Sequence, residues 1–208
     1  MRSLIAIPLL AACASNPPAG SPSYDSVRAR LAAEPTRMWM AASNSAGSIT
    51  ASHYTSDGWQ TGMVALAISN GELDAHADAS GKLAITALEI DLGTIDIPPT
   101  VFGKPAQMRD VKLAMSGAPD VTTTWSDSDD ATATAMVALD LSWTLAVNNG
   151  TTPLGTQSLA PMPVDVTLTG TGDQVDATIA IQKTGDLWSW ADLVKLGDLT
   201  LTLDAASN

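Results

Sequence analysis

Three polar residues spaced by two, Asp74, His76 and Asp78, are the first candidates for chemistry in this sequence. Residues two apart on an extended strand project from the same face, so the three side chains would form one row. Histidine and carboxylates are common metal ligands. The intervening residues are apolar, however, and the same pattern is the polar half of an ordinary alternating strand. We therefore expect a solvated face here in preference to a metal site.

A second acidic group, Asp127, Asp129 and Asp130, lies in the segment TWSDSDDAT. Acidic loops that are rich in oxygen ligands bind calcium. A full calcium loop also needs a glycine at its turn and a terminal glutamate, and this segment has neither. We expect a turn at the start of a strand, and the three aspartates remain weak candidates for a metal site.

The sequence offers few residues for catalysis. His53, close to Asp57, is the only histidine besides His76, and there is no G-x-S-x-G nucleophile elbow. The glycines at 170–172 are similar to part of a phosphate-binding loop, but the segment lacks a lysine and a following helix, so we expect a hairpin turn there. These observations predict a non-catalytic protein without a cofactor.

Tryptophan supplies the one candidate contact surface. Six of the nine aromatic residues are tryptophan. Trp143 falls within a stripe of apolar residues and is expected in the core. Trp188 and Trp190 lie two residues apart in a predicted short helix, so one of the two is expected to face outward. An exposed indole ring is suited to contact surfaces because it combines a large apolar area with one polar N–H group.

The amino terminus has the features of an export signal. A single positive charge at Arg2 precedes about nine apolar residues at 4–12, which are too few to span a bilayer. The segment ends in Leu10-Ala11-Ala12-Cys13, which resembles the lipobox of bacterial lipoproteins at every position. The alternative is an ordinary signal peptide in which the cysteine occurs by chance.

The resemblance implies that the signal is cleaved before Cys13, and that Cys13 is acylated and anchors the protein in a membrane. Two or more acyl chains hold a protein stably at a bilayer. Position 14 is alanine and not the aspartate that often retains such proteins at the inner membrane, so the resemblance implies an exported protein of the outer membrane of a Gram-negative cell. Residues 13–23 are rich in Pro, Gly and Ser and are expected to form a flexible tether.

The charge and cysteine content of the sequence limit the classes of partner that the protein could bind. The 208 residues include 22 acidic and 10 basic residues, for a net charge of -12. Nucleic acids and anionic lipid surfaces bind clustered lysine and arginine, so this balance argues against both. One cysteine provides no intramolecular disulfide and no zinc cluster. The remaining expected partners are the membrane, through the anchor, and an envelope protein or apolar ligand.

The positioning elements are predicted to be strands. Residues 72–78 alternate between polar and apolar, and the alternation slips by one near Leu88, which predicts a bulge. Asn-Gly at 70–71 and Ser-Gly at 80–81 are predicted hairpin turns, so three consecutive antiparallel strands result. The longest alternation covers residues 131–147, which form either one long curved strand or a strand that bends near Val137. Shorter alternations follow at 164–168, 175–181 and 199–203.

Two short helices are expected, at residues 24–34 before Pro35 and at residues 186–196 before Gly197. The first helix is alternatively part of the tether. A sheet with one apolar face must cover that face. The sequence therefore predicts a mainly β fold over residues 24–208, with antiparallel sheets in a sandwich-like or curved two-layer arrangement and one or two short helices. A barrel and a clam-shaped sheet are the alternatives.

Three classes of function follow. The first is a non-catalytic, lipid-anchored envelope protein that acts as a binding or scaffold domain. The second is a carrier that holds a lipid or other apolar ligand in a groove of the β domain. The third, an enzyme, is disfavoured because no catalytic constellation is recognisable.

Overall fold

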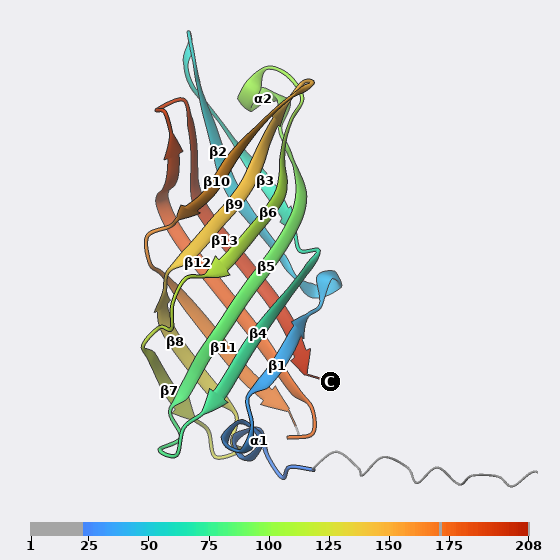
Figure 1. The fold of residues 1–208 in the computed structure, drawn as a ribbon, viewed down its shortest axis with the longest axis vertical. Coiled ribbons are helices and arrows are strands. Elements are labelled where there is room, and N and C mark those ends of the chain that lie inside the picture. The colour runs from blue at the N-terminus through green and yellow to red at the C-terminus, as the bar shows by residue number, and fades with distance from the viewer. Residues whose placement is uncertain (1–22, 171, 208) are drawn as a thin grey trace, which may run out of the picture.

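Alternating apolar and polar residues form strands along most of the chain in a computed structural model that describes residues 23–170 and 172–207 (Figure 1). All thirteen strands belong to one sheet, and every pairing is antiparallel. The strands are β1 (Thr36–Met40), β2 (Ala46–Thr55), β3 (Gly58–Ala67), β4 (Asn70–Ala77), β5 (Leu83–Ile97), β6 (Ala106–Met115), β7 (Val121–Trp125), β8 (Ala131–Val137), β9 (Leu139–Val147), β10 (Gly150–Ser158), β11 (Met162–Gly170), β12 (Val175–Trp190) and β13 (Val194–Ser207).

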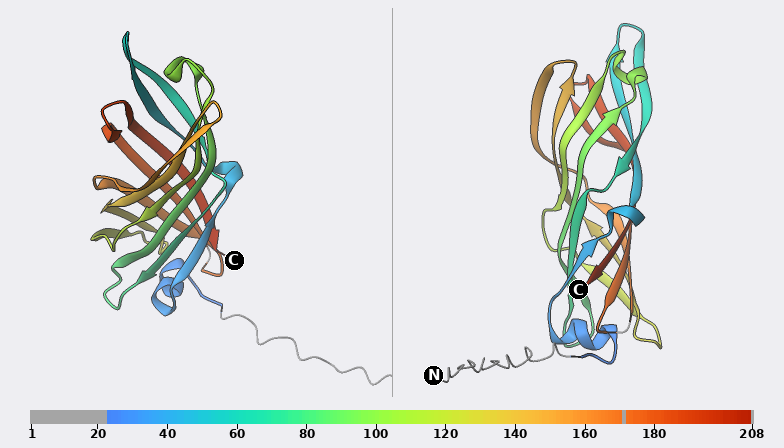
Figure 2. Two further views of the ribbon diagram at one scale, coloured as in Figure 1. Left: turned by 45° about the horizontal axis from the view of Figure 1, so that its top comes forward. Right: turned by 90° about the vertical axis from the view of Figure 1, so that its right-hand side faces the viewer.

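The sheet curls so that its apolar face is enclosed between two layers. In Figure 1 the strands β10, β9, β6, β5, β4 and β1 form the nearer layer, and β13, β12 and β11 cross behind them. The two further views in Figure 2 show the same curled sheet from other sides. This arrangement confirms the predicted mainly β, curved two-layer fold. Among the described residues, no helix is long and apolar enough to cross a membrane.

Helix α1 (Val27–Ala33) lies at the lower end of the sheet in Figure 1, where the described chain begins. Ser26 caps it by accepting a hydrogen bond from the Ala29 backbone N–H, and Val27 and Leu31 are buried. The helix predicted near this position is therefore confirmed. Its apolar side adds to the core, so the first element of the fold helps to close one end of the layers.

A second helix, α2 (Pro99–Phe102), lies at the opposite end and was not predicted. It begins with a proline, whose fixed φ suits the first helical turn, and it ends at Gly103 with a φ of 66°. Pro99 and Gly103 are the sequence features from which this helix could have been predicted. A short 3-10 helix, η1 (Ala42–Asn44), joins β1 to β2.

Several local predictions are confirmed. The register of β4 against β5 shifts between Asp74 and Ala75, which is the predicted bulge. Gly81 has a φ of 82° in the turn between these strands, as the predicted hairpin requires. β11 and β12 also form the predicted hairpin, because they pair from Gly170 opposite Val175 to Val164 opposite Ile181.

The hairpin predicted at residues 70–71 is wrong. Asn70 and Gly71 begin β4 and pair with Asp91 and Ile90 of β5, and β4 has no pairing with β3. Gly71 is needed for space and not for a turn, because a Cβ there would lie 2.7 Å from the Glu89 carbonyl oxygen and closer still to Met40. A strand glycine that permits close packing has the same sequence signature as a turn glycine.

The helix predicted at residues 186–196 is also wrong. These residues form the end of β12, a turn, and the start of β13, with Trp188 opposite Leu196 and Trp190 opposite Val194. Ala191 and Asp192 turn the chain with φ values of 49° and 52°. Non-glycine residues seldom adopt this conformation, so the tight turn could not be predicted from the residue types.

The long alternation at residues 131–147 is two strands that part at Ala138. β8 pairs with β7 and β11, whereas β9 pairs with β6 and β10. The break lies one residue beyond the bend that was predicted as one of two alternatives. It sends the chain from one layer of the sheet to the other.

Candidate functional site

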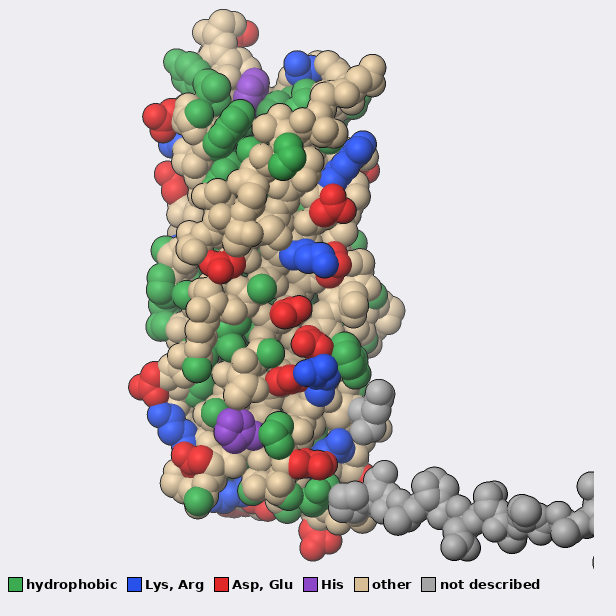
Figure 3. Space-filling view, viewed as in Figure 1, with side chains coloured by type: hydrophobic (Ala, Val, Ile, Leu, Met, Phe, Trp, Pro, Cys, Tyr) green, Lys and Arg blue, Asp and Glu red, His purple; other side chains and the backbone are tan. Residues whose placement is uncertain are grey.

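The two histidines lie at opposite ends of the molecule (Figure 3). The His53 ring stacks on Phe102 with 4.5 Å between the ring centroids, and His76 lies on β4. The Nδ1 atoms of both rings are buried without a hydrogen-bond partner. The structure therefore does not bring the two predicted histidine positions together.

The acidic residues near His76 have separate structural roles. Asp74 accepts two hydrogen bonds from the Arg37 guanidinium, each of 2.9 Å. Asp78 accepts hydrogen bonds from the Ser80 hydroxyl and the Lys82 backbone N–H, which lowers the pKa of its carboxyl group below the ordinary value. Within residues 23–170 and 172–207, no three His, Cys, Asp or Glu side chains are grouped so that they could hold a metal ion.

The acidic group at 127–130 forms the turn between β7 and β8. Asp130 donates its backbone N–H to the Ser126 hydroxyl and accepts from the Ser128 hydroxyl. Asp129, with a φ of 60°, lies 4.0 Å from Arg28 of α1. The placement agrees with the expected turn, and it joins this turn to the first helix.

The two tryptophans of the predicted contact surface have different environments. Trp188 is partly buried and packs edge-on against Trp143, with ring centroids 5.3 Å apart. Trp143 is buried, as predicted. Trp190 is 39% exposed and lies beside the turn between β12 and β13. The structure thus places only Trp190 of the pair in an open position.

Trp190 has large exposed neighbours that the sequence analysis missed. We call Tyr54, Trp59, Trp190 and Leu193 the aromatic end, and each of these residues is 39% to 49% exposed. The Tyr54 backbone N–H donates a hydrogen bond of 2.9 Å to the Leu193 carbonyl, which joins the β2–β3 hairpin to the β12–β13 turn. Two distant parts of the sequence therefore meet at this end, where the strand register places Tyr54 and Trp59 on the outer face of the sheet and Trp190, opposite the buried Val194, on its inner face.

Ring contacts support the aromatic end. Tyr54 and Trp59 are cross-strand partners in the β2–β3 hairpin, and their rings meet edge to face at 5.4 Å. The Lys195 ammonium lies 4.7 Å from the centre of the Trp59 ring. Hydrophobic side chains gather at this upper end in Figure 3, and α1 lies at the other end of the sheet.

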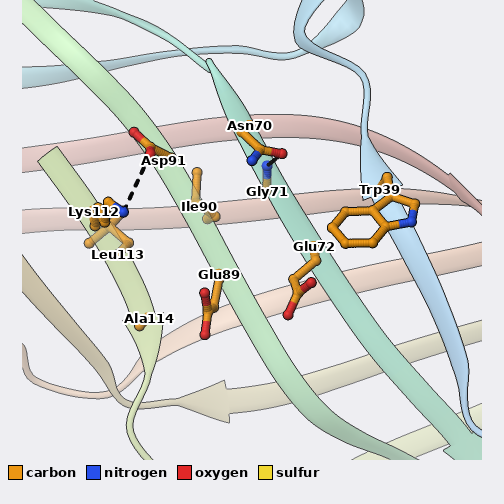
Figure 4. A pocket seen from close by; sticks show the side chains of 10 residues that line it. All are labelled: Trp39, Asn70, Gly71, Glu72, Glu89, Ile90, Asp91, Lys112, Leu113 and Ala114. Atoms are coloured by element: carbon orange, nitrogen blue, oxygen red, sulfur yellow. Dashed lines mark hydrogen bonds and ion pairs between the residues drawn. The ribbon is translucent and has the colours of Figure 1, made fainter. Parts of the chain in front are cut away.

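A shallow hollow lies on the outer face of β1, β4, β5 and β6 (Figure 4). Its volume is about 180 Å³. Its sides carry an exposed indole, three carboxylates, an amide and an ammonium group. Gly71, Ile90 and Leu113 lie at its floor. The residues that line it are Trp39, Asn70, Gly71, Glu72, Glu89, Ile90, Asp91, Lys112, Leu113 and Ala114.

Charge is arranged unevenly in this hollow. Lys112 pairs with Asp91 at 3.6 Å, and Arg37 lies 3.5 Å from Glu72. Hydrogen bonding to Asp74, followed by the charges of Asp74 and Glu72, raises the pKa of Arg37 above its ordinary value. Among the described residues, no Lys, Arg or His nitrogen lies within 4.0 Å of the Glu89 carboxylate.

The apolar interior between the layers is filled by side chains. The cavity there measures about 10 Å³ and is lined only by apolar residues. Such a volume is close to that of one water-sized probe, so this cavity has no space for an acyl chain. The lining includes Leu187, which is buried because residues 186–190 form the end of strand β12 and not a helix.

Comparison with known proteins gives no relative: no protein-family model, no curated protein and no solved structure matches the chain. The predicted lipidation residue Cys13 lies outside the described residues. The sequence contained the exposed aromatics of the aromatic end and the carboxylates of the hollow, but their grouping depends on strand register. No local pattern indicated that β2 pairs with β13.

Proposed function

We propose that this protein is a non-catalytic, lipid-anchored envelope protein whose aromatic end binds a partner protein. The observation that carries the proposal is the exposure of Tyr54, Trp59 and Leu193 together with Trp190 at one end of the sheet. Large exposed aromatic residues that cluster on a surface are typical of protein contact sites, where they supply most of the binding free energy.

The surroundings of this surface also suit a protein contact. Asp57 and Asp192 lie in the two turns that flank the aromatic residues, so polar groups border an apolar centre. The aromatic end is also remote from α1, where the described chain begins. An anchor at Cys13 would leave this surface directed away from the membrane to which the chain is attached.

The test is site-specific photo-crosslinking in native cells. A photoreactive phenylalanine analogue at position 59 is expected to give one discrete crosslinked product, and the same analogue at Thr167 on the exposed face of β11 is the matched control. Tyr54→Ser together with Leu193→Ser should reduce the product at position 59 at least fivefold without changing the melting temperature by more than a few degrees. Equal crosslinking at positions 59 and 167 would contradict the proposal.

The carrier alternative has less support. An apolar ligand would have to separate the two layers, because the interior cavity of about 10 Å³ has no room for it. Mass spectrometry of a solvent extract from the purified protein distinguishes the two proposals. A stoichiometric lipid in that extract would favour the carrier.

A further inference from the structure

The Trp39 side chain is held as an open platform at one side of the outer-face hollow. Trp39 is 43% exposed, and the Arg37 guanidinium lies over one face of its ring, 5.6 Å from the ring centre. Arg37 is itself fixed by two hydrogen bonds to Asp74 and by the nearby Glu72 carboxylate. An exposed indole whose neighbour is anchored in this way loses little freedom when a flat apolar surface stacks on it.

Strand register places the carboxylates of the hollow in line with this platform. Trp39 is the cross-strand partner of Glu72, Glu72 is the partner of Glu89, and Glu89 is the partner of Ala114. The neighbouring row contains Asn70, Asp91 and Lys112. Four strands at a spacing of about 4.8 Å give the hollow a length of about 14 Å. The site is therefore an elongated, shallow track with Trp39 at one side.

The pairing of Glu72 with Glu89 sets the chemistry that fits. Two like charges directly opposite each other on adjacent strands repel. Arg37 offsets the charge of Glu72, but among the described residues Glu89 has no cation within 4.0 Å. A bound ammonium group would remove this repulsion, and hydroxyl groups would donate to the remaining carboxylate and amide oxygens.

We propose that the outer-face hollow binds a glycan that contains amino sugars. A sugar ring presents an apolar C–H face that stacks on the Trp39 indole, and its rim of hydroxyl and amine donors meets Glu72, Glu89 and Asn70. A shallow, elongated track suits the successive rings of an extended glycan, whereas a single small molecule usually binds in a deep pocket. This site is separate from the aromatic end, so it stands independently of the proposed protein contact.

The test uses the full-length protein in detergent and isothermal titration calorimetry. The probes are a tetramer of β-1,4-linked glucosamine and the corresponding N-acetylated tetramer, which lacks the charged amines. We expect the glucosamine tetramer to bind at least fivefold more tightly than the N-acetylated one. We also expect Trp39→Ala and Glu89→Gln each to weaken its binding at least tenfold, whereas Trp59→Ala at the aromatic end leaves binding unchanged.

Two results would overturn the proposal. One is the absence of binding of the glucosamine tetramer to folded wild-type protein. The other is binding that is unchanged in both Trp39→Ala and Glu89→Gln. Equal affinity for the two tetramers would overturn the role given to the amine. If Trp39→Ala lowers the melting temperature, Trp39→Phe keeps an aromatic ring and should retain most of the binding.

Discussion

At the scale of single residues, Gly47 is a position where the fold leaves no space. It lies in β2 opposite Leu201 of β13, and an added Cβ would press against the Thr200 carbonyl oxygen and the Leu201 side chain. Gly47→Ala should therefore destabilise the protein by roughly 1–3 kcal/mol, which is usual for overpacking. Chemical denaturation measures this, with Gly117→Ala as the control because nothing lies within 4 Å of that Cβ position. Equal stabilities of the two variants would show that β2 adjusts to β13 without strain.

The residues that make up the candidate sites were harder to predict from the sequence than the fold. One exposed tryptophan was expected from the pair at 188 and 190, and Trp190 is the exposed one. Tyr54 and Leu193 gave no signal, because their proximity depends on the pairing of two hairpin ends that are far apart in the sequence. The same is true of Glu72 and Glu89, whose pairing follows from a register that includes a bulge.

At the scale of elements, the β4–β5 turn depends on one ionised side chain. The Asp78 carboxylate accepts hydrogen bonds from Ser80 and Lys82, and these bonds lower its pKa in the folded protein. A lowered folded-state pKa means that the stabilisation is fully present above the unfolded pKa of about 3.9 and is lost as the pH falls through the folded value.

Asp78→Ala should accordingly lower the melting temperature by a few degrees at pH 7, and the difference from wild type should shrink below about pH 4. Asp57→Ala, in the turn between β2 and β3, is the control. Melting curves recorded by circular dichroism between pH 3 and pH 7 make the comparison. A difference that stays constant over this range would assign the effect of Asp78 to packing and not to its charge.

Elements whose face pattern is regular were predictable, and those set by tight turns were not. Alternation located β4, the core of β12 and the two parts of the long segment at 131–147. The spacing of Leu187, Trp190 and Val194 fits a helical face as well as it fits two strands joined by a turn. Only the left-handed backbone of Ala191 and Asp192, which sequence propensity disfavours, decides between them.

At the scale of the whole molecule, the mainly β class followed from composition and alternation, because a one-sided apolar sheet must curl or pair. The order of the strands did not, since the sheet places β1 beside β13 and β6 beside β9 by contacts over long sequence distances. The anchor is a property of this scale, and it is a prediction that the described residues do not test.

Cys13→Ser should abolish acylation and leave the protein uncleaved or released from the membrane. Fractionation and metabolic labelling with a radioactive fatty acid measure both effects. Ser23→Ala, at the end of the predicted tether, is a control that should keep normal anchoring. A Cys13→Ser protein that remains membrane-bound and processed would contradict the lipoprotein assignment.

The pairing of β1 with β13 joins the two ends of the described chain: Met38 lies opposite Ser207, and Met40 opposite Ala205. A ribosome or a translocation channel delivers the chain from its amino terminus, so β1 and β2 emerge long before the strand that completes them. Pairing over such a distance is slow to form, and unpaired strands are prone to aggregate. The arrival of β13 is therefore the step at which the two halves of the newly made sheet, β10 to β1 and β12 to β7, become one continuous sheet.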